Sequence, residues 1–480
     1  MKGCKVWVAM VLTFLACGLC LSLVVLGSMR YGGARELLLR LRLELVSMLR
    51  RPPAPFVPTP LPTTLLTVVR RASPTPIWPT PTPPARDVSE TAPTLTATPI
   101  PHMPTALPVI NTRMIDLLPT QHISKKDSTQ ANSSPTATLW VQESFSQTAG
   151  PPRHPAPAAP SVQLSGITHI WQKWNNCGPA TLAMYLSYFG ISLTQAEIAA
   201  ALKPNWDDKN VSPHEMADFA TQYGLKALVR VNGTAERLRL LLSNGLPVMI
   251  ETWLELEPNN GMGHYRLLTG YEDAQQVWIA YDSYVSIGVK ANAPYQGIRL
   301  SYTEMDTLWA VFNRTYLLLF TEESAPIVAS ILGEEMNDRV MWERALARAQ
   351  AEIASRPDDP FAHFNLGSAL VALGEYDQAA TAFDRARVIG LPWRMLWYQF
   401  APFRAYYETG RYAELLALAD ATIATAGEIE EVYYYKGLGL AALGRQDEAR
   451  QNWQHALTLN PHYKEAVAAL AASAEAPSSP

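Results

Sequence analysis

The most informative stretch of this chain reads Trp171-Gln172-Lys173-Trp174-Asn175-Asn176-Cys177-Gly178-Pro179-Ala180. Gly178 and Pro179 indicate a loop that enters a helix, and the apolar residues 181–189 continue that helix. Cys177 is then expected at the helix N-terminus, where unpaired N–H groups and the helix dipole favour a thiolate. The other three cysteines lie within the first twenty residues, so a disulfide-stapled scaffold is excluded.

A nucleophilic thiolate needs a histidine as its acid–base partner. The same region contains His169, His214 and His264, and His264 opens the predicted strand 265–271 behind Gly261-Met262-Gly263. Asp282 ends the next predicted strand, 277–281. If these strands pair antiparallel, His264 and Asp282 become neighbours, and the carboxylate can orient the ring.

Gln172 is the candidate for stabilising an oxyanion, because its amide N–H₂ and the Cys177 backbone N–H can both donate hydrogen bonds. Each candidate also has a structural alternative. Cys177 can be a small buried hydrophobic residue, His264 a satisfied core histidine, Asp282 a turn residue, and Gln172 an ordinary surface residue.

These motifs together resemble the bacteriocin-processing cysteine peptidases, family thirty-nine, and more closely its stand-alone "-like" branch. The resemblance rests on Gln172, Asn-Asn-Cys177-Gly-Pro-Ala, Gly-His264-Tyr and Tyr-Asp282, and it covers about residues 163–323. It implies a papain-like fold with Cys177 as nucleophile, His264 as base and acid, Asp282 as the orienting group and Gln172 as oxyanion donor.

The chain departs from the best-known members of that family, which are fused to an ABC transporter and cleave leader peptides after a double glycine. No Walker-type phosphate loop follows the domain here, and the Gln172-to-Cys177 spacing is five where the papain-like pattern commonly has six. The resemblance therefore does not imply the substrate.

Local signals within 163–323 predict an α+β domain with an antiparallel sheet. Capping boxes at Thr194/Glu197 and Ser212/Glu215 open helices that run to Leu202 and to Gly224. A third helix is expected from Thr234 to Leu242. The β-rich runs follow later, at 247–252, 265–271, 277–281 and 316–320.

Residues 334–474 are predicted to form an all-α domain, because one pattern occurs three times and resembles the tetratricopeptide repeat. Leu373-Gly374-Glu375-Tyr376-Asp377-Gln378-Ala379 is echoed at 409–415 and again at 443–449. Gly367 and Gly437 lie seven residues before the glycines of the first and third copies, whereas the middle copy has Phe403 there. We expect helix 338–355 to pack on the first hairpin, and the aromatic residues Trp393, Trp397, Tyr398, Tyr406 and Tyr407 to form core between helices.

The N-terminal residues 1–29 are predicted to be a membrane anchor, because Val6 to Gly27 is free of charge and long enough to cross a ~30 Å hydrocarbon core. Lipidation of Cys17 is the alternative. An amphipathic juxtamembrane segment, 30–50, follows. Its arginines favour a cytoplasmic C-terminal side, whereas the composition of the next hundred residues favours an extracytoplasmic stalk.

Residues 51–160 are rich in proline and threonine, as in Pro79-Thr80-Pro81-Thr82-Pro83-Pro84. Proline fixes φ and lacks a donor N–H, so we expect a disordered, extended linker without helix or sheet. The net charge of −4 gives no support to nucleic-acid binding. No cofactor and no metal site is predicted, since the candidate domain lacks ligand spacing of the His-x₃-His or Cys-x₂-Cys type.

The resulting hypothesis is a bacterial, membrane-anchored cysteine peptidase that hydrolyses a peptide or protein amide bond, with repeats that recruit a protein partner or substrate. The alternative is a non-catalytic scaffold, in which an inactive peptidase-like fold binds peptides and the repeats mediate protein–protein interaction.

The expected location is the cell membrane, single-pass, with the soluble domains outside the cytoplasm. Protease added to intact cells should therefore digest the repeats, as followed by immunoblotting against them. Digestion only after the cells are permeabilised would place the soluble domains inside instead.

Overall fold

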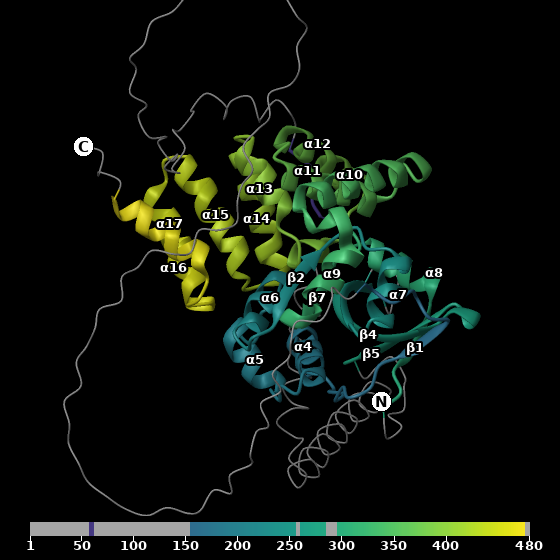
Figure 1. The fold of residues 1–480 in the computed structure, drawn as a ribbon. Coiled ribbons are helices and arrows are strands. Elements are labelled where there is room, and N and C mark those ends of the chain that lie inside the picture. Colours follow the sequence, from purple (N-terminus) through teal and green to yellow (C-terminus); the bar gives the residue numbers. More distant parts are fainter. Residues whose placement is uncertain (1–56, 62–153, 256–259, 285–294, 476–480) are drawn as a thin grey trace, which may run out of the picture. The chain divides into compact units, whose positions relative to one another are not determined.

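The computed structural model describes residues 57–61, 154–255, 260–284 and 295–475. A mixed α/β domain comes first, followed by consecutive helices up to Glu475 (Figure 1). Among the described residues, no helix combines the length and hydropathy needed to span a bilayer. The predicted anchor (1–29) and juxtamembrane segment (30–50) lie outside the described residues.

A seven-stranded sheet forms the centre of the first domain, and all of its pairings are antiparallel, as predicted. The strand order is β2-β7-β3-β4-β5-β6, with β1 paired to β4. The strands are β1 Ser161–Gln163, β2 Lys226–Arg230, β3 Val248–Leu254, β4 Met262–Glu272, β5 Val277–Asp282, β6 Ile298–Ser301 and β7 Tyr316–Phe320.

Helices cover both faces of this sheet, because alternate residues of each strand point to opposite sides. Met249, Leu267 and Leu317 pack with α4 (Cys177–Tyr188), α5 (Gln195–Leu202) and α6 (Pro213–Thr221). Val248, Ile250 and Leu268 pack instead with α7 (Ala235–Ser243), α8 (Tyr302–Ala310) and α9 (Ala325–Leu332). Both predicted capping boxes form, at Thr194/Glu197 and Ser212/Glu215.

The C-terminal region consists of helical hairpins of the tetratricopeptide type. Its helices are α10 Asp338–Ser355, α11 Pro360–Leu373, α12 Tyr376–Ile389, α13 Ala401–Glu408, α14 Tyr412–Ala426, α15 Glu430–Ala442, α16 Gln446–Leu459 and α17 Lys464–Glu475. As predicted, α10 packs on the first hairpin, through Met341, Ala345 and Ala369.

Two glycines explain how closely the paired helices approach. A Cβ added to Gly367 would lie 2.6 Å from the ring of Phe383, and one added to Gly437 would lie 2.3 Å from the ring of Trp453. In both copies the aromatic residue follows its glycine by sixteen positions. The first and third repeats therefore pack a glycine of one helix against an aromatic ring of the next in the same way. A larger side chain at either glycine would overlap that ring.

The middle repeat differs because Pro392 and Pro402 cannot lie in the interior of a helix, and Pro402 instead lies in the first turn of α13. Its first helix, α13, has only 8 residues. The preceding residues form a short 3₁₀ helix, η5 (Trp393–Trp397), followed by Tyr398 and Gln399. This segment, 391–400, leaves the regular hairpin pattern and reaches the first domain.

Contacts between the two domains are polar as well as apolar. Arg314 Nη1 donates to Glu352 Oε1 at 2.7 Å, and Asn365 Nδ2 donates to the carbonyl of Ala310 at 2.7 Å. Val231 of the first domain belongs to the same apolar cluster as Met341 of α10. The repeats are thus packed directly on the peptidase-like domain.

The described parts of the proline-rich segment 51–160 are in contact with folded elements at both ends. The carbonyl of Ala159 accepts the Tyr271 hydroxyl at 2.5 Å, and Ala156 N donates to Asn244 Oδ1 at 2.8 Å. At the other end, residues 57–61 lie against the repeats, and Val57 N donates to the carbonyl of Leu391 at 2.8 Å.

Gly367→Ala should destabilise the repeats by about 1–3 kcal/mol, because the added methyl group overlaps the Phe383 ring. Urea unfolding followed by tryptophan fluorescence measures the loss. Ser368→Ala is the matched control, because its hydroxyl bonds only Phe364 O within its own helix. Equal stability of the two variants would contradict the packing argument.

Candidate active site

Cys177 is the first residue of α4, as predicted, and its side chain is partly exposed. Asn175 precedes it with φ of 53°, a left-handed conformation that turns the chain sharply into the helix. The first turn of α4 contains no acidic residue, so nothing there opposes the attraction between the helix N-terminus and a thiolate.

His264 and Asp282 are brought together by the pairing of β4 with β5. Arg266 lies directly opposite Asp282 in this pairing, and His264 is two residues away on the same strand face. Nε2 of His264 lies 3.0 Å from Oδ1 of Asp282. Both side chains are buried, with exposed fractions of 2% and 1%.

The Asp282 carboxylate has two further donors. Arg266 Nε donates to Oδ2 at 2.9 Å, and the Tyr284 backbone N–H donates to Oδ1 at 2.8 Å. Arg266 also donates from Nη1 to Thr252 Oγ1 at 2.5 Å, and Thr252 in turn donates to the carbonyl of His264 at 2.9 Å. The histidine and the arginine are therefore held in one closed network.

The electrostatic environment favours an ion pair at neutral pH. Burial lowers the pKa of His264, but the charge and hydrogen bond of Asp282, together with an interaction with the Cys177 thiol, outweigh it and raise the pKa to about 9. Burial raises the pKa of Asp282, whereas His264, Arg266 and the Tyr284 N–H lower it to about 2. Imidazolium and carboxylate are thus the forms present at pH 7.

Gln172 is positioned by the residue that follows Asp282. Ser283 Oγ donates to Gln172 Oε1 at 2.9 Å, and Gln172 N donates to the carbonyl of Ser283 at 2.8 Å. Because the amide oxygen is engaged by Ser283, the orientation of the amide is set, and its N–H₂ group is directed away from that hydroxyl.

The other two histidines of the domain, His169 and His214, have different surroundings. The His169 ring lies 2.7 Å from the carbonyl oxygen of Asp282, and His214 is exposed on α6.

Arg266 and Glu251 are site residues that the sequence analysis missed. Each is a charged residue in the buried part of its strand, and that mismatch was the available signal. Burial, with a smaller contribution from Cys177, raises the pKa of Glu251 to about 8 despite a hydrogen bond from Gln399. Gln399 Nε2 lies 3.4 Å from Glu251 Oε1.

Tyr398, from the repeat domain, also lies close to the candidate site. A Cβ added to Gly263, next to His264, would lie 3.0 Å from the Tyr398 ring. Tyr398 also lies near enough to Cys177 for the charge of the thiolate to raise the tyrosine pKa, in addition to the larger effect of burial. Tyr398 was predicted to be core between repeat helices; it does pack against the apolar cluster of the repeats, and its ring also contacts the peptidase-like domain at Gly263 and Phe312.

Comparison with protein families assigns residues 159–310 to the Peptidase_C39 like family. This match covers about a third of the chain and confirms the resemblance that the motifs around Cys177, His264 and Asp282 indicated. A comparison with curated proteins found no match.

Solved structures align with each domain separately. A putative C39-like peptidase from Bacillus anthracis is 18% identical, covers 34% of this chain and 98% of its own, and has a TM-score of 0.28. The peptidase domain of Streptococcus ComA is 15% identical, covers 33% and 100%, and has a TM-score of 0.24. MamA from Desulfovibrio magneticus RS-1 is 23% identical, covers 28% and 76%, and has a TM-score of 0.26. At these TM-scores the likenesses carry no functional conclusion.

Asp282→Asn should lower the pKa of His264 from about 9 to 6.5 or below, because burial remains while the stabilising charge is lost. The imidazolium present at pH 7 would then be lost. Carbon-13 NMR of the histidine-labelled chain measures the titration, with the resonance assigned through His264→Gln. Asp273→Asn is the control, since Asp273 bonds Arg239 and Tyr302 instead. An unchanged pKa in Asp282→Asn would refute the assignment of the raised pKa to Asp282.

Proposed function

We propose that the protein is a cysteine peptidase in which Cys177 attacks a peptide carbonyl carbon as the thiolate. The observation that carries the proposal is the buried His264–Asp282 pair, at 3.0 Å, next to a cysteine at a helix N-terminus. A histidine pKa of about 9 favours the imidazolium that a neighbouring thiolate requires.

The proposed reaction divides among four residues. Cys177 Sγ forms a bond to the carbonyl carbon, and the Gln172 amide and the Cys177 N–H stabilise the resulting oxyanion. The His264 imidazolium gives its proton to the leaving amine, which departs as the C–N bond breaks. Water, deprotonated by His264, then hydrolyses the thioester and frees Cys177. Asp282 keeps the ring oriented throughout.

The repeats would take part in selecting the substrate. Tyr398 and Gln399 lie against the strands that carry His264 and Glu251, so a peptide approaching Cys177 would pass beside segment 391–400. We propose that the enzyme acts on a peptide or protein, and that the repeats recruit that protein or a partner. Attachment to the membrane through residues 1–29, with the soluble domains outside the cytoplasm, completes the proposal.

Labelling by a thiol-directed peptidyl electrophile tests the activated cysteine. The full chain should be labelled at Cys177, and His264→Ala should slow labelling about 100-fold or more, because the ion pair is lost. Mass spectrometry separates Cys177 from the three N-terminal cysteines. His214→Ala, at an exposed position on α6, is the matched control and should label like the wild type. Equally slow labelling of wild type and His264→Ala would leave the non-catalytic scaffold as the better description.

A further inference from the structure

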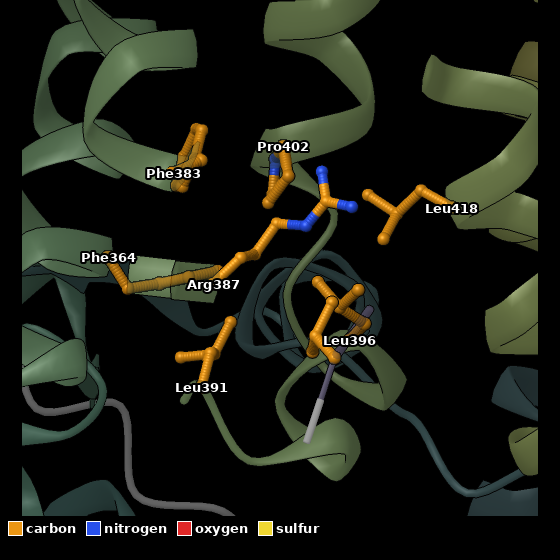
Figure 2. Close-up of a pocket in the computed structure, with 8 residues that line it drawn as sticks. Phe364, Phe383, Arg387, Leu391, Leu396, Pro402 and Leu418 are labelled. Carbon is orange, nitrogen blue, oxygen red and sulfur yellow. The ribbon is translucent and has the colours of Figure 1, made fainter. Parts of the chain in front are cut away.

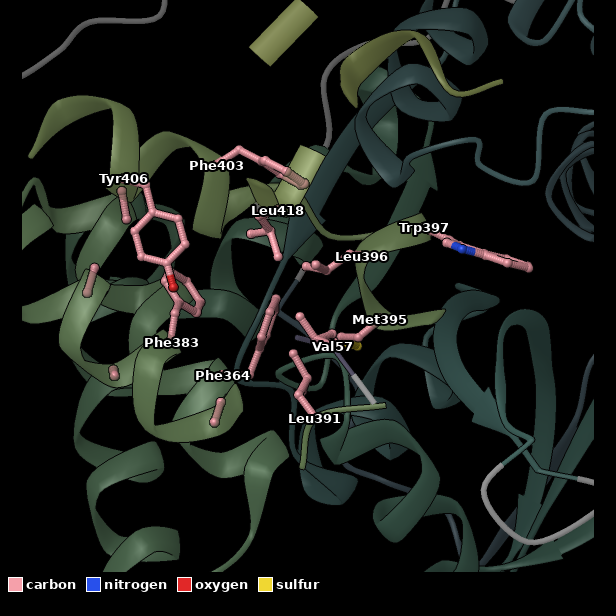
Figure 3. Close-up of a cluster of buried hydrophobic side chains, with 14 of the residues drawn as sticks. Val57, Phe364, Phe383, Leu391, Met395, Leu396, Trp397, Phe403, Tyr406 and Leu418 are labelled. Atoms are coloured by element: carbon pink, nitrogen blue, oxygen red, sulfur yellow. The ribbon is translucent and has the colours of Figure 1, made fainter. Parts of the chain in front are cut away.

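Residues 57–61, with the sequence Val-Pro-Thr-Pro-Leu, lie on the repeats as an extended segment. Val57 is the apolar anchor, with 3% of its surface exposed. Val57 lines a small pocket together with Phe364, Phe383, Arg387, Leu391, Leu396, Pro402 and Leu418, and Figure 2 labels these seven neighbours. Figure 3 shows Val57 within a buried apolar cluster that includes Phe364, Phe383, Leu391, Met395, Leu396, Tyr406 and Leu418.

A buried ion pair of the repeats contacts the backbone of this segment. Arg387 Nε donates to the carbonyl of Pro58 at 2.7 Å, and Nη2 donates to the carbonyl of Thr59 at 3.1 Å. Glu414 Oε2 accepts the Leu61 N–H at 2.7 Å. Arg387 and Glu414 also bond each other, and their side chains are 3% and 0% exposed.

The segment supplies hydrogen-bond acceptors for two of the three nitrogen atoms of the Arg387 guanidinium. Within the repeats, Arg387 Nη1 donates to Tyr406 and Glu414, whereas Nε and Nη2 find their acceptors in Pro58 and Thr59. A buried guanidinium that leaves donors unsatisfied is costly. Arg387 and Glu414, with the apolar residues around Val57, therefore form a site for extended backbone. This site is called the groove below.

The residues of the segment match this mode of recognition. Pro58 and Pro60 have no N–H to satisfy and hold the backbone extended, which lowers the entropy lost on binding. Pro58 and Thr59 are exposed, so the groove contacts their carbonyls and leaves their side chains unselected. The groove therefore discriminates between peptide sequences at the position of Val57, whose side chain is buried.

The chain contains the same Pro-Thr-Pro motif at 74–76, 79–81 and 81–83, where Ser73, Trp78 and Thr80 replace the valine. A threonine is close to valine in size but would bring a hydroxyl group among apolar side chains. A serine would leave the apolar pocket unfilled, and a tryptophan is much larger than the valine that occupies it. The pocket thus favours the motif at 58–60, whose contact with the repeats the structure describes.

We propose that this groove is a peptide-binding site for an extended Pro-x-Pro segment preceded by a branched aliphatic residue, and that residues 57–61 occupy it as an exchangeable ligand from the same chain. The groove is selective at one side chain and otherwise recognises backbone. An external peptide of the same chemistry binds only when the built-in segment leaves.

Fluorescence anisotropy with a fluorescein-labelled peptide of residues 54–64 tests this in the full-length, detergent-solubilised chain. Cys177→Ser is present in every sample, so the readout does not depend on the proposed peptidase activity. Val57→Asp should vacate the groove and bind the peptide about tenfold or more tightly than the chain with Val57, in which the tethered segment competes at high effective concentration. Val57→Ala is the milder second variant, with an intermediate effect. Circular dichroism confirms that both variants retain their helices.

Controls on the peptide side leave the protein unchanged. A 54–64 peptide with Ser in place of Val57, and the native peptide 70–80, which carries Ser73 at that position, should bind the Val57→Asp chain about tenfold or more weakly than the native 54–64 peptide. No binding to either Val57 variant would overturn the proposal, and equal binding of all peptides would overturn the selectivity of the pocket. A wild-type dimer that becomes monomeric in Val57→Asp would show that a second copy supplies the segment, which contradicts occupancy from the same chain.

Discussion

The Asp282 carboxylate is the interaction on which the candidate site depends. A buried charge is tolerated only when its hydrogen-bonding capacity is met, and Asp282 meets it with His264, Arg266 and the Tyr284 N–H. The same strand end continues into Ser283, which orients Gln172. The end of β5 therefore positions the proposed acid–base group and the proposed oxyanion donor together, and α4 begins with the candidate nucleophile Cys177.

The repeats complete the surroundings of this site through an irregularity in their own pattern. Two prolines shorten the middle repeat and create segment 391–400, whose Tyr398 and Gln399 contact Gly263 and Glu251. Regular hairpins would have kept these side chains within the helical array. The irregular repeat is thus the part of the helical domain that contacts the strands carrying the catalytic candidates.

The features that were predictable from sequence depend on residues close together in the chain. Capping boxes, the helix after Cys177 and the antiparallel β4–β5 pair follow from local signals, and the pair places His264 beside Asp282. Arg266 was detectable only as a charged residue between Tyr265 and Leu267 in the middle of a strand. The strands β1 and β6, with 3 and 4 residues, were not predicted because so few residues carry little periodicity. Strand β2 was missed because Lys226 and Arg230 lie within its 5 residues, so it lacks the continuous apolar run of β7. Tyr398 against Gly263 and Val57 in its pocket were not predictable, since their partners lie far away in the sequence.

The binding of residues 57–61 to the repeats changes the consequence of a proteolytic cut in the chain. Residues 62–153 join two points that both lie on the folded unit, since the segment before them contacts the repeats and the segment after them contacts the peptidase-like domain. A cut anywhere between these points would yield two covalently separate fragments that the Val57 pocket and Arg387 still hold together. Release of the folded part from the N-terminal residues would then follow the dissociation rate of a short peptide, and proteolysis alone would not set its timing.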